Sequence, residues 1–265
     1  MLKVINITRI FNPNTVNERV ALDNVSLTLN TGDFVTVIGG NGAGKSTLLN
    51  CVAGVYPPDA GSIFIDDINV TRLPEYKRAK YMGRVFQDPM MGTASDMEIQ
   101  ENLALAYRRG QSRTLRWGIT AEEKALYKRM LQSLDLGLED RMSSKVGLLS
   151  GGQRQALTLL MATLHKPRLL LLDEHSAALD PKTAIKVLAL SDRFIKEGRL
   201  TTMMVTHNMR DAIKYGNRLI MMSGGSIVID VSGEEKQKLD VEDLLKMFER
   251  VRGDDQDIPD RMILG

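Results

Sequence analysis

Residues Gly39–Thr47 read GGNGAGKST and match the phosphate-loop pattern G-x-x-x-x-G-K-[ST]. The match lies between a run that favours a strand, DFVTVIGG, and a run that favours a helix, TLLNCVAG. In this context the glycines let backbone N–H groups turn toward phosphate oxygens, and the helix N-terminus adds positive partial charge. A glycine-rich strand-to-helix turn without a ligand is the alternative. The full match in its required context favours a nucleotide site.

The residue types of this loop assign parts of the nucleotide to particular side chains. Lys45 is expected to reach the β- and γ-phosphates, and the Ser46 hydroxyl is expected to ligate Mg²⁺. The nucleotide contacts expected in the loop are Gly39, Asn41, Gly42, Gly44, Lys45, Ser46 and Thr47. These residues predict nucleotide binding and leave the reaction open.

Apolar runs of two kinds predict two kinds of strand. DFVTVIGG, RLLLLDE and TTMMVTH are continuously apolar and end in polar or glycine residues, as parallel strands covered by helices on both faces do. LKVINITRI and VSLTLN alternate apolar and polar residues, which is typical of half-exposed antiparallel strands. SIFID near residue 62, LIMM near 219 and SIVID near 226 are expected to be strands of the same half-exposed kind.

Between these strands, residues 98–165 are mostly helical in pattern. EIQENLALAYRR has apolar residues at helical spacing, and Thr120 with Glu123 forms a capping box before EEKALYKRMLQSL. A last amphipathic run, VEDLLKMFERV, precedes GDDQDIPDRMILG, whose composition predicts a poorly ordered tail.

These patterns together predict an α/β fold: a P-loop NTPase core with a mainly parallel sheet, an N-terminal antiparallel β-subdomain and an inserted helical subdomain. The expected domain is residues 1–230, with the insertion at about 88–165. Residues 231–265 are expected to form a C-terminal helix and a polar tail.

The composition limits which cellular compartment and which kinds of partner are expected. The 265 residues are 43% hydrophobic, enough for a buried core, and 35 Lys and Arg nearly balance 33 Asp and Glu. A net charge of +2 gives no field for nucleic acid, so none is expected as a partner. Cys51 is the only cysteine, and no signal peptide or bilayer-spanning run is present, which favours the cytosol.

A second anion site is indicated by LSGGQRQ at Leu149–Gln155, which directly precedes a helix-like run. Ser150 suits a helix N-cap, and Gly151 and Gly152 would let a ligand approach free N–H groups. A capped helix without a ligand is the alternative. At this motif the chain resembles the ABC ATPase family, and the resemblance covers about residues 2–230.

The resemblance implies that the signature of one subunit faces the γ-phosphate bound by the other, in a head-to-tail homodimer with two shared ATP sites. The signature residues that it implies are Leu149, Ser150, Gly151, Gly152 and Gln153.

Leu169–Glu174 reads LLLLDE, a buried strand whose carboxylates emerge at its C-terminal end, where ligands of open α/β sheets bind. By the resemblance, Asp173 holds Mg²⁺ through water and Glu174 is the general base that polarises the attacking water. A core strand followed by an acidic helix cap is the alternative.

Four further positions gain roles only from the resemblance. Gln87 in RVFQDP resembles the Q-loop residue that contacts Mg²⁺ and the water, and otherwise it belongs to a turn. His207 resembles the switch histidine at the γ-phosphate, and otherwise it is a surface residue at a strand end. Asp180 in SAALDP resembles the D-loop residue at the dimer interface, with an Asp-Pro turn as the alternative. Phe11 is the candidate aromatic for stacking on adenine, although such a residue is more often core.

Two departures from the family pattern stand out. His175-Ser176 replaces the usual Pro-Thr after Glu174, which puts the D-loop geometry in doubt, and the helix after LSGGQRQ lacks the usual Arg-Ala-Leu. Neither departure removes a catalytic group.

The resemblance implies an ATPase subunit, with ATP and Mg²⁺ as ligands, peripheral on the cytoplasmic face of the membrane. It would dimerise on ATP and drive a permease in solute import, with a solute-binding protein as an indirect partner. Met90 and Met91 are candidate docking residues for the permease, or they pack into the helical subdomain. The basic stretch RRGQSRTLRW could touch lipid headgroups or be merely solvated.

The stretch MMGTASDMEIQENLALAYRRG is similar in sequence to bacterial importer ATPases of the aromatic amino acid (tryptophan/tyrosine) type. An exporter or lipid-extraction ATPase is the alternative. A soluble ABC ATPase that acts on nucleic acid or ribosomes is a third, and it fits less well because the chain has neither a tandem repeat nor a heptad arm.

Overall fold

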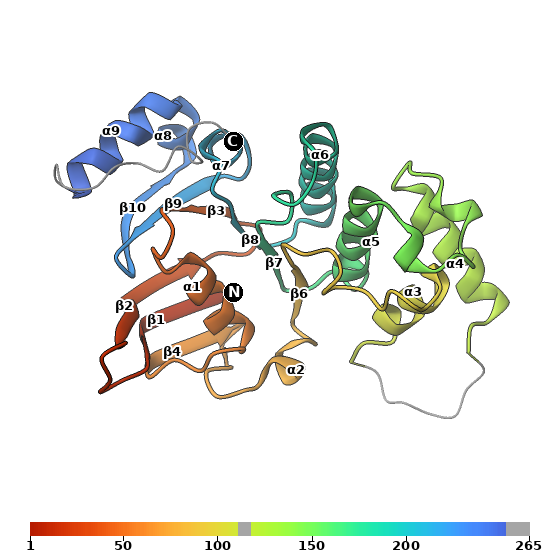
Figure 1. Cartoon of the computed structure of the whole chain (residues 1–265), viewed down its shortest axis with the longest axis horizontal. Helices are drawn as coiled ribbons and strands as arrows, with labels where there is room; N and C mark the ends of the chain where they lie inside the picture. Colours follow the sequence, from red (N-terminus) through yellow and green to blue (C-terminus); the bar gives the residue numbers. More distant parts are fainter. Residues whose placement is uncertain (111–117, 253–265) are drawn as a thin grey trace.

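The structure, a computed structural model, describes residues 1–110 and 118–252 and contains two β-sheets (Figure 1). The smaller sheet is antiparallel in the order β2-β1-β4-β5. Its strands are β1 (Leu2–Phe11), β2 (Arg19–Leu29), β4 (Ala60–Ile65) and β5 (Ile68–Asn69). Buried and exposed residues alternate along much of β1 and β2, which confirms the expected N-terminal antiparallel strands.

The larger sheet has the strand order β10-β9-β3-β8-β7-β6, and only the β10–β9 pair is antiparallel. Its strands are β3 (Phe34–Ile38), β6 (Met82–Val85), β7 (Leu169–Asp173), β8 (Thr202–Val205), β9 (Arg218–Ser223) and β10 (Ser226–Ser232). The three continuously apolar runs form β3, β7 and β8, as predicted. Helix α1 and the small sheet cover one face, and α5 and α6 cover the other.

The expectation for LIMM was right in part: β9 pairs antiparallel with β10, but it is not half-exposed. It also pairs in parallel with β3, and its four central residues are buried. Leu219 and Met221 pack against α7 and α9, whereas Ile220 and Met222 belong to the core around α1. The burial was not predicted because it comes from packing against α7 and α9, and the residues LIMM do not themselves encode that contact.

Strand β6, which reads MGRV, was not anticipated. It contains Gly83 and Arg84 and therefore has no apolar run to mark it. A Cβ on Gly83 would lie 2.3 Å from the Ala162 carbonyl oxygen, so this glycine lets α5 pack directly on the strand.

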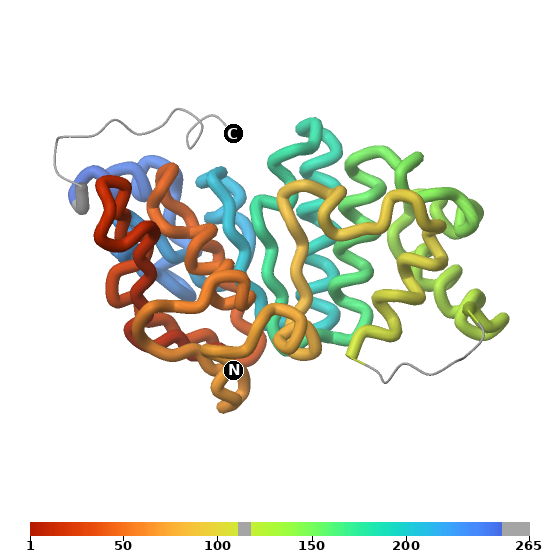
Figure 2. Tube along the Cα trace, turned by 60° about the horizontal axis from the view of Figure 1, so that its bottom comes forward, coloured from red at the N-terminus to blue at the C-terminus, as the bar shows by residue number. Residues whose placement is uncertain are grey.

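The helices are α1 (Lys45–Ala53), α2 (Glu75–Arg78), α3 (Ile99–Tyr107), α4 (Ala121–Gln132), α5 (Gly151–Thr163), α6 (Pro181–Gly198), α7 (Met209–Lys214), α8 (Gly233–Lys238) and α9 (Val241–Arg252). Short 3-10 turns occupy Leu138–Asp140 and Val146–Leu148. Thr120 and Glu123 form the expected capping box at α4. Helices α3, α4 and α5 share a core of their own, and α3 and α4 lie at the far end of the molecule from the antiparallel sheet (Figures 1 and 2). The division into 1–230, 88–165 and 231–265 stays a prediction.

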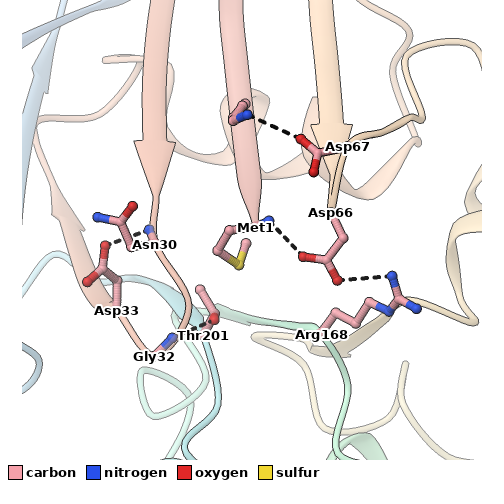
Figure 3. A network of polar contacts seen from close by, with 9 residues as sticks. Met1, Asn30, Gly32, Asp33, Asp66, Asp67, Arg168 and Thr201 are labelled. Carbon is pink, nitrogen blue, oxygen red and sulfur yellow. Dashed lines mark hydrogen bonds and ion pairs between the residues drawn. The ribbon is translucent and has the colours of Figure 1, made fainter.

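Polar contacts join the two sheets at the N-terminal edge of the parallel strands (Figure 3). Arg168, just before β7, contacts Asp66 at 2.9 Å, and Asp66 follows β4. The Gly32 N–H, just before β3, donates to Thr201 Oγ1 at 2.9 Å. The opposite, C-terminal edge of the sheet is where the predicted site residues emerge.

Two predictions fall outside the described residues. They are the part of the basic stretch RRGQSRTLRW from residue 111 to Trp117, although its first three residues (108–110) are described, and the polar tail at 253–265. Within the described part, no helix has the length and apolar character needed to cross a membrane.

Candidate active site

The phosphate loop joins the end of β3, at Ile38, to the start of α1, at Lys45. Gly39 has φ +147, and a Cβ there would lie 2.2 Å from the Met222 carbonyl oxygen. Gly44, the helix N-cap, has φ +102, and a Cβ there would lie 2.6 Å from the Ala21 carbonyl oxygen. Both positions require glycine, because the loop turns through the left-handed region while neighbouring strands press against it.

Lys45 extends back into the curve of this loop. Its Nζ donates to the carbonyl oxygens of Gly39 at 2.7 Å and Gly40 at 3.2 Å, which uses two of its three N–H donors. The side chain is buried, and burial lowers the pKa of Lys45, against the raising effect of Glu174 and Asp173. The loop therefore fixes an ammonium group at the position where the pattern expects the β- and γ-phosphates.

A pocket of about 220 Å³ brings this loop together with Phe11 and Glu174. It is lined by Phe11, Arg19, Ala21, Asn41, Gly42, Ala43, Gly44, Lys45, Ser46, Thr47 and Glu174. Phe11 ends β1, and its ring lies edge-on to Tyr56 with 5.3 Å between centroids. An aromatic ring and an ammonium that line the same pocket suit a base and its phosphates. Arg19, which donates to the Gly42 carbonyl oxygen at 3.0 Å, was missed because no motif contains it.

Glu174 and His207 meet where β7 and β8 end side by side. His207 Nδ1 lies 3.3 Å from Glu174 Oε2. This contact outweighs burial and holds the pKa of Glu174 below its ordinary value. Glu174 has φ +43, a conformation that is uncommon for a residue with a side chain, and its N–H donates to the Val205 carbonyl oxygen at 3.0 Å. The result is an ionised carboxylate, fixed in place, that can accept a proton from water.

Asp173, the last residue of β7, lies beside an arginine. Burial raises the pKa of Asp173, whereas Arg84, whose Nη2 donates to Asp173 Oδ2 at 3.2 Å, acts in the lowering direction. The Ser46 hydroxyl lies exposed at the start of α1. The described residues contain no group of three or more His, Cys, Asp or Glu that could hold a metal. One carboxylate with a hydroxyl fits Mg²⁺, which prefers few protein oxygens, water and substrate phosphates.

The signature residues form the capped start of α5. Ser150 Oγ accepts from the Gln153 N–H at 3.3 Å, and Gln153 Oε1 accepts from the Ser150 N–H at 3.2 Å, which confirms the N-cap. Gly151 is exposed, whereas a Cβ on Gly152 would lie 2.1 Å from Thr183 Cγ2. Gly152 is therefore needed for the packing of α5 on α6. None of Leu149, Ser150, Gly151, Gly152 or Gln153 is among the described residues that line the Lys45 pocket.

Gln87 and Asp180 flank the site without lining the pocket. Gln87 is exposed just beyond β6, and β6 pairs with β7 so that Val85 lies opposite Leu172. Gln87 therefore shares the sheet edge of Glu174. Asp180 caps α6 by accepting from the Thr183 N–H at 3.1 Å, and its bonds with Thr183 lower its pKa.

Gln155 is a buried residue that links three parts of the site. Its Nε2 donates to the carbonyl oxygens of Phe86 at 2.9 Å and His175 at 2.8 Å, next to Gln87 and Glu174 in sequence. Although Gln155 is the last residue of LSGGQRQ, nothing in the sequence indicates that it is buried, because a Gln in a helix is usually solvated.

His175, where the chain departs from the family pattern, is also buried, and its side chain anchors the D-loop. Its Nε2 lies 2.8 Å from Ser191 Oγ, which itself donates to the Val187 carbonyl oxygen at 2.9 Å. Since the one hydroxyl hydrogen is used by Val187, Nε2 of His175 is the donor. Burial lowers the pKa of His175 to about 4, so the ring stays neutral.

Replacing Gln155 with leucine leaves two buried carbonyl oxygens without their donor. We expect Gln155→Leu to lower the free energy of unfolding by about 1–3 kcal/mol, the cost of an unsatisfied buried polar group. Urea unfolding followed by circular dichroism measures this loss. Gln132→Leu, at an exposed position of α4, is the control and should change it by less than about 0.5 kcal/mol. Equal unfolding midpoints for the two variants would show that the Gln155 bonds do not stabilise the fold.

The sequence profile of the ABC transporter family matches residues 22–177. The chain is 44% identical to a tyrosine transport ATP-binding protein of Clostridioides difficile, over 94% of this chain and 99% of the relative. It is 32% identical to an energy-coupling factor transporter ATP-binding protein of Acetivibrio thermocellus, over 85% and 78%. Among solved structures, a dimeric ATP-binding cassette in a post-hydrolysis state with ADP and Pi superposes with a TM-score of 0.73 at 29% identity, over 88% of this chain and 98% of that one.

Proposed function

The chain belongs to the ABC transporter family as an ATP-hydrolysing, ATP-binding subunit, and we propose that it acts as an ATP-dependent homodimer that drives a membrane permease in solute import. The observation that supports the dimer most is the separation of the two anion-binding motifs. Lys45 and Glu174 line one pocket, whereas the capped start of α5 lies outside that pocket. A second copy arranged head to tail would supply the missing helix N-terminus, and one solved relative is a dimer.

Within each pocket, we assign a role to each predicted residue. Lys45 and the partner copy's signature helix stabilise the charge that spreads over the transferring phosphoryl group. Ser46, Asp173 and Gln87 would hold Mg²⁺, which would supply further positive charge when bound. Glu174 takes the proton of the attacking water.

The remaining predicted residues position these groups. His207 orients Glu174 through the 3.3 Å contact. Phe11, which lines the pocket, stacks on adenine, and Asp180 shapes the D-loop at the dimer interface.

A groove between the large sheet and α3 supports the permease as partner. Its volume is about 1470 Å³, and its lining includes Phe86, Met91 and Leu105. Met91 is 68% exposed and Leu105 is 56% exposed, so both present apolar surface to solvent. Met90 is 49% exposed as well, so neither methionine is buried in the helical subdomain, which supports the docking role. An exposed apolar groove of this kind suits an amphipathic helix.

The groove gives the test of the proposed partner. Affinity isolation of the chain from membranes should recover an integral-membrane permease, and Leu105→Glu should abolish that recovery because it places a charge on the apolar wall. Ile5→Glu, at an exposed apolar position of β1 outside the groove, is the control and should leave recovery intact. Recovery of ribosomes or nucleic acid in place of a permease, or equal recovery with both variants, would refute the assignment.

The substrate class follows from the relative with 44% identity, which is named for tyrosine transport. We propose an amino acid, of the aromatic type, as cargo. Transport would place the chain on the cytoplasmic face of the membrane, with a solute-binding protein as an indirect partner through the permease.

A further inference from the structure

Gln155, one turn into α5, is held by two hydrogen bonds to backbone. Its Nε2 donates to the Phe86 carbonyl oxygen at 2.9 Å and to the His175 carbonyl oxygen at 2.8 Å, which uses both N–H groups of the amide. The side chain is fully buried, and its Oε1 has no partner among the described residues. The reverse orientation would place Oε1 against two other acceptors, so the pair of carbonyl oxygens fixes the amide.

These two bonds anchor the loop after Glu174 to the sheet. Phe86 directly follows β6, and β6 pairs in parallel with β7, so the Phe86 carbonyl oxygen is a fixed point at this edge of the sheet. His175 directly follows Glu174, which itself follows the end of β7. Gln155 therefore ties the residue next to Glu174 to the end of a neighbouring strand.

Glu174 needs such support because its backbone is strained. Its φ of +43 lies in the left-handed region, and a residue with a side chain stays there only where its surroundings fix it. On one side, the Val205 carbonyl oxygen at the end of β8 accepts from the Glu174 N–H at 3.0 Å. On the other side, His175 is held at its carbonyl oxygen by Gln155 and at its ring by Ser191 Oγ, 2.8 Å from Nε2. The strained residue thus depends on its contacts with β8, α5 and α6.

We propose that Gln155 is a positioning residue for ATP hydrolysis, which holds the Glu174 carboxylate where it can take the proton of the attacking water. Reacting groups must lie about 3–3.5 Å apart, and a shift of about 1 Å can cost about 10² in rate. Without the amide donors, the backbone of Glu174 can relax from the left-handed region and carry the carboxylate away from the water. This inference rests on the proposed role of Glu174 as the base.

Binding of ATP should not depend on Gln155. The phosphate loop joins β3 to α1, and none of Gln155, Phe86 and His175 is among the described residues that line the Lys45 pocket. A group that acts only on the chemical step lowers kcat and leaves the dissociation constant for ATP unchanged. A purely structural group would instead lower the folded fraction and leave the kcat of each folded molecule unchanged.

Gln155→Met tests this difference, because methionine keeps the length of the side chain and lacks its donors. Its kcat per folded molecule should fall about 10- to 100-fold, while its dissociation constant for ATP stays within about threefold. Phosphate release, equilibrium dialysis and circular dichroism measure kcat, binding and the folded fraction. Two controls should keep kcat within about twofold: Gln132→Met, at an exposed position of α4, and Val70→Ala, which opens a cavity in the core shared by the small sheet and α1.

A double variant shows whether Gln155 acts through the base. Glu174→Gln combined with Gln155→Met should turn over ATP within about threefold of Glu174→Gln alone, because the position of the side chain no longer matters once the base is absent. Single-turnover phosphate release measures both rates. Losses that multiply in the double variant would show that Gln155 acts elsewhere and would overturn the proposal.

A kcat of Gln155→Met within about twofold of the wild type, or a loss of ATP binding as large as the loss of kcat, would also overturn it. If this variant does not fold, which thermal unfolding identifies, Gln155→Asn provides the same comparison, because its shorter amide cannot reach both carbonyl oxygens. Near-normal turnover of Glu174→Gln alone would overturn the assigned base and this proposal with it. A slow Glu174→Gln beside a normal Gln155→Met would overturn this proposal only.

Discussion

Replacement of Glu174 with glutamine should lower the ATP turnover number by about 10²–10⁴, the usual contribution of a positioned general base. The amide keeps the size of the side chain and cannot take a proton from water. Its pocket neighbours Lys45 and Phe11 are untouched, so the dissociation constant for ATP should stay within about threefold, well under the tenfold change that 1.4 kcal/mol would cause. Phosphate release measures turnover, and equilibrium dialysis measures binding.

The control for this variant is Glu197→Gln, at an exposed position of α6, which should turn over ATP like the wild type. Near-normal turnover in Glu174→Gln would remove this carboxylate from the proposed mechanism. Loss of ATP binding in the same variant would show that Glu174 contributes to the fold or to binding rather than to the proton transfer.

Replacement of Lys45 with methionine should weaken ATP binding by about 10- to 150-fold, because a hydrogen bond to a charged group contributes about 1.5–3 kcal/mol. Methionine fills a similar volume, and burial already disfavours the ammonium, as the lowered pKa of Lys45 shows. Methionine removes the cost of burying the ammonium, but it also leaves the Gly39 and Gly40 carbonyl oxygens without their donor. These two contributions oppose each other, so the thermal midpoint should change far less than ATP binding does. Equilibrium dialysis with labelled ATP, beside a thermal melt, separates the two effects.

Lys186→Met, at an exposed position of α6, is the matched control and should bind ATP normally. ATP binding of normal strength by Lys45→Met would show that the loop glycines and the start of α1 provide the phosphate site without the ammonium.

The sequence predicted those parts of the fold whose signal is local. The GGNGAGKST loop, the runs that became β3, β7 and β8, and the capping box at Thr120 each combine residue types with a direct structural reason. Strand β6 has no such signal, since MGRV contains a glycine and a half-buried arginine. The burial of strand β9 was not predicted, because α7 and α9 cover its second face and nothing in the residues LIMM encodes that contact.

For the site as well, residues with a local sequence signal could be predicted and the others could not. Lys45, Phe11 and Glu174 could be named because motifs contain them or the family resemblance implies them, and the fold places all three around one pocket. Gln155 and Arg84 lie in the quoted stretches LSGGQRQ and RVFQDP, but their roles could not be predicted, because each acts through contacts with residues far away in the chain. A helical glutamine and a strand arginine are common surface residues, and only the packing of β6 between β7 and the groove gives these two their partners.

Each active site is proposed to be shared between two copies of the chain. The molecular mass of Glu174→Gln in solution tests this sharing most directly. With ATP and Mg²⁺ this variant should have twice the 29.5 kDa mass of the chain, and with ADP it should return to 29.5 kDa. Glu174→Gln combined with Ser150→Arg should still bind ATP yet remain at 29.5 kDa, since the arginine blocks the start of α5. A single variant that stays monomeric in saturating ATP, or a dimer that Ser150→Arg leaves unchanged, would contradict the shared site.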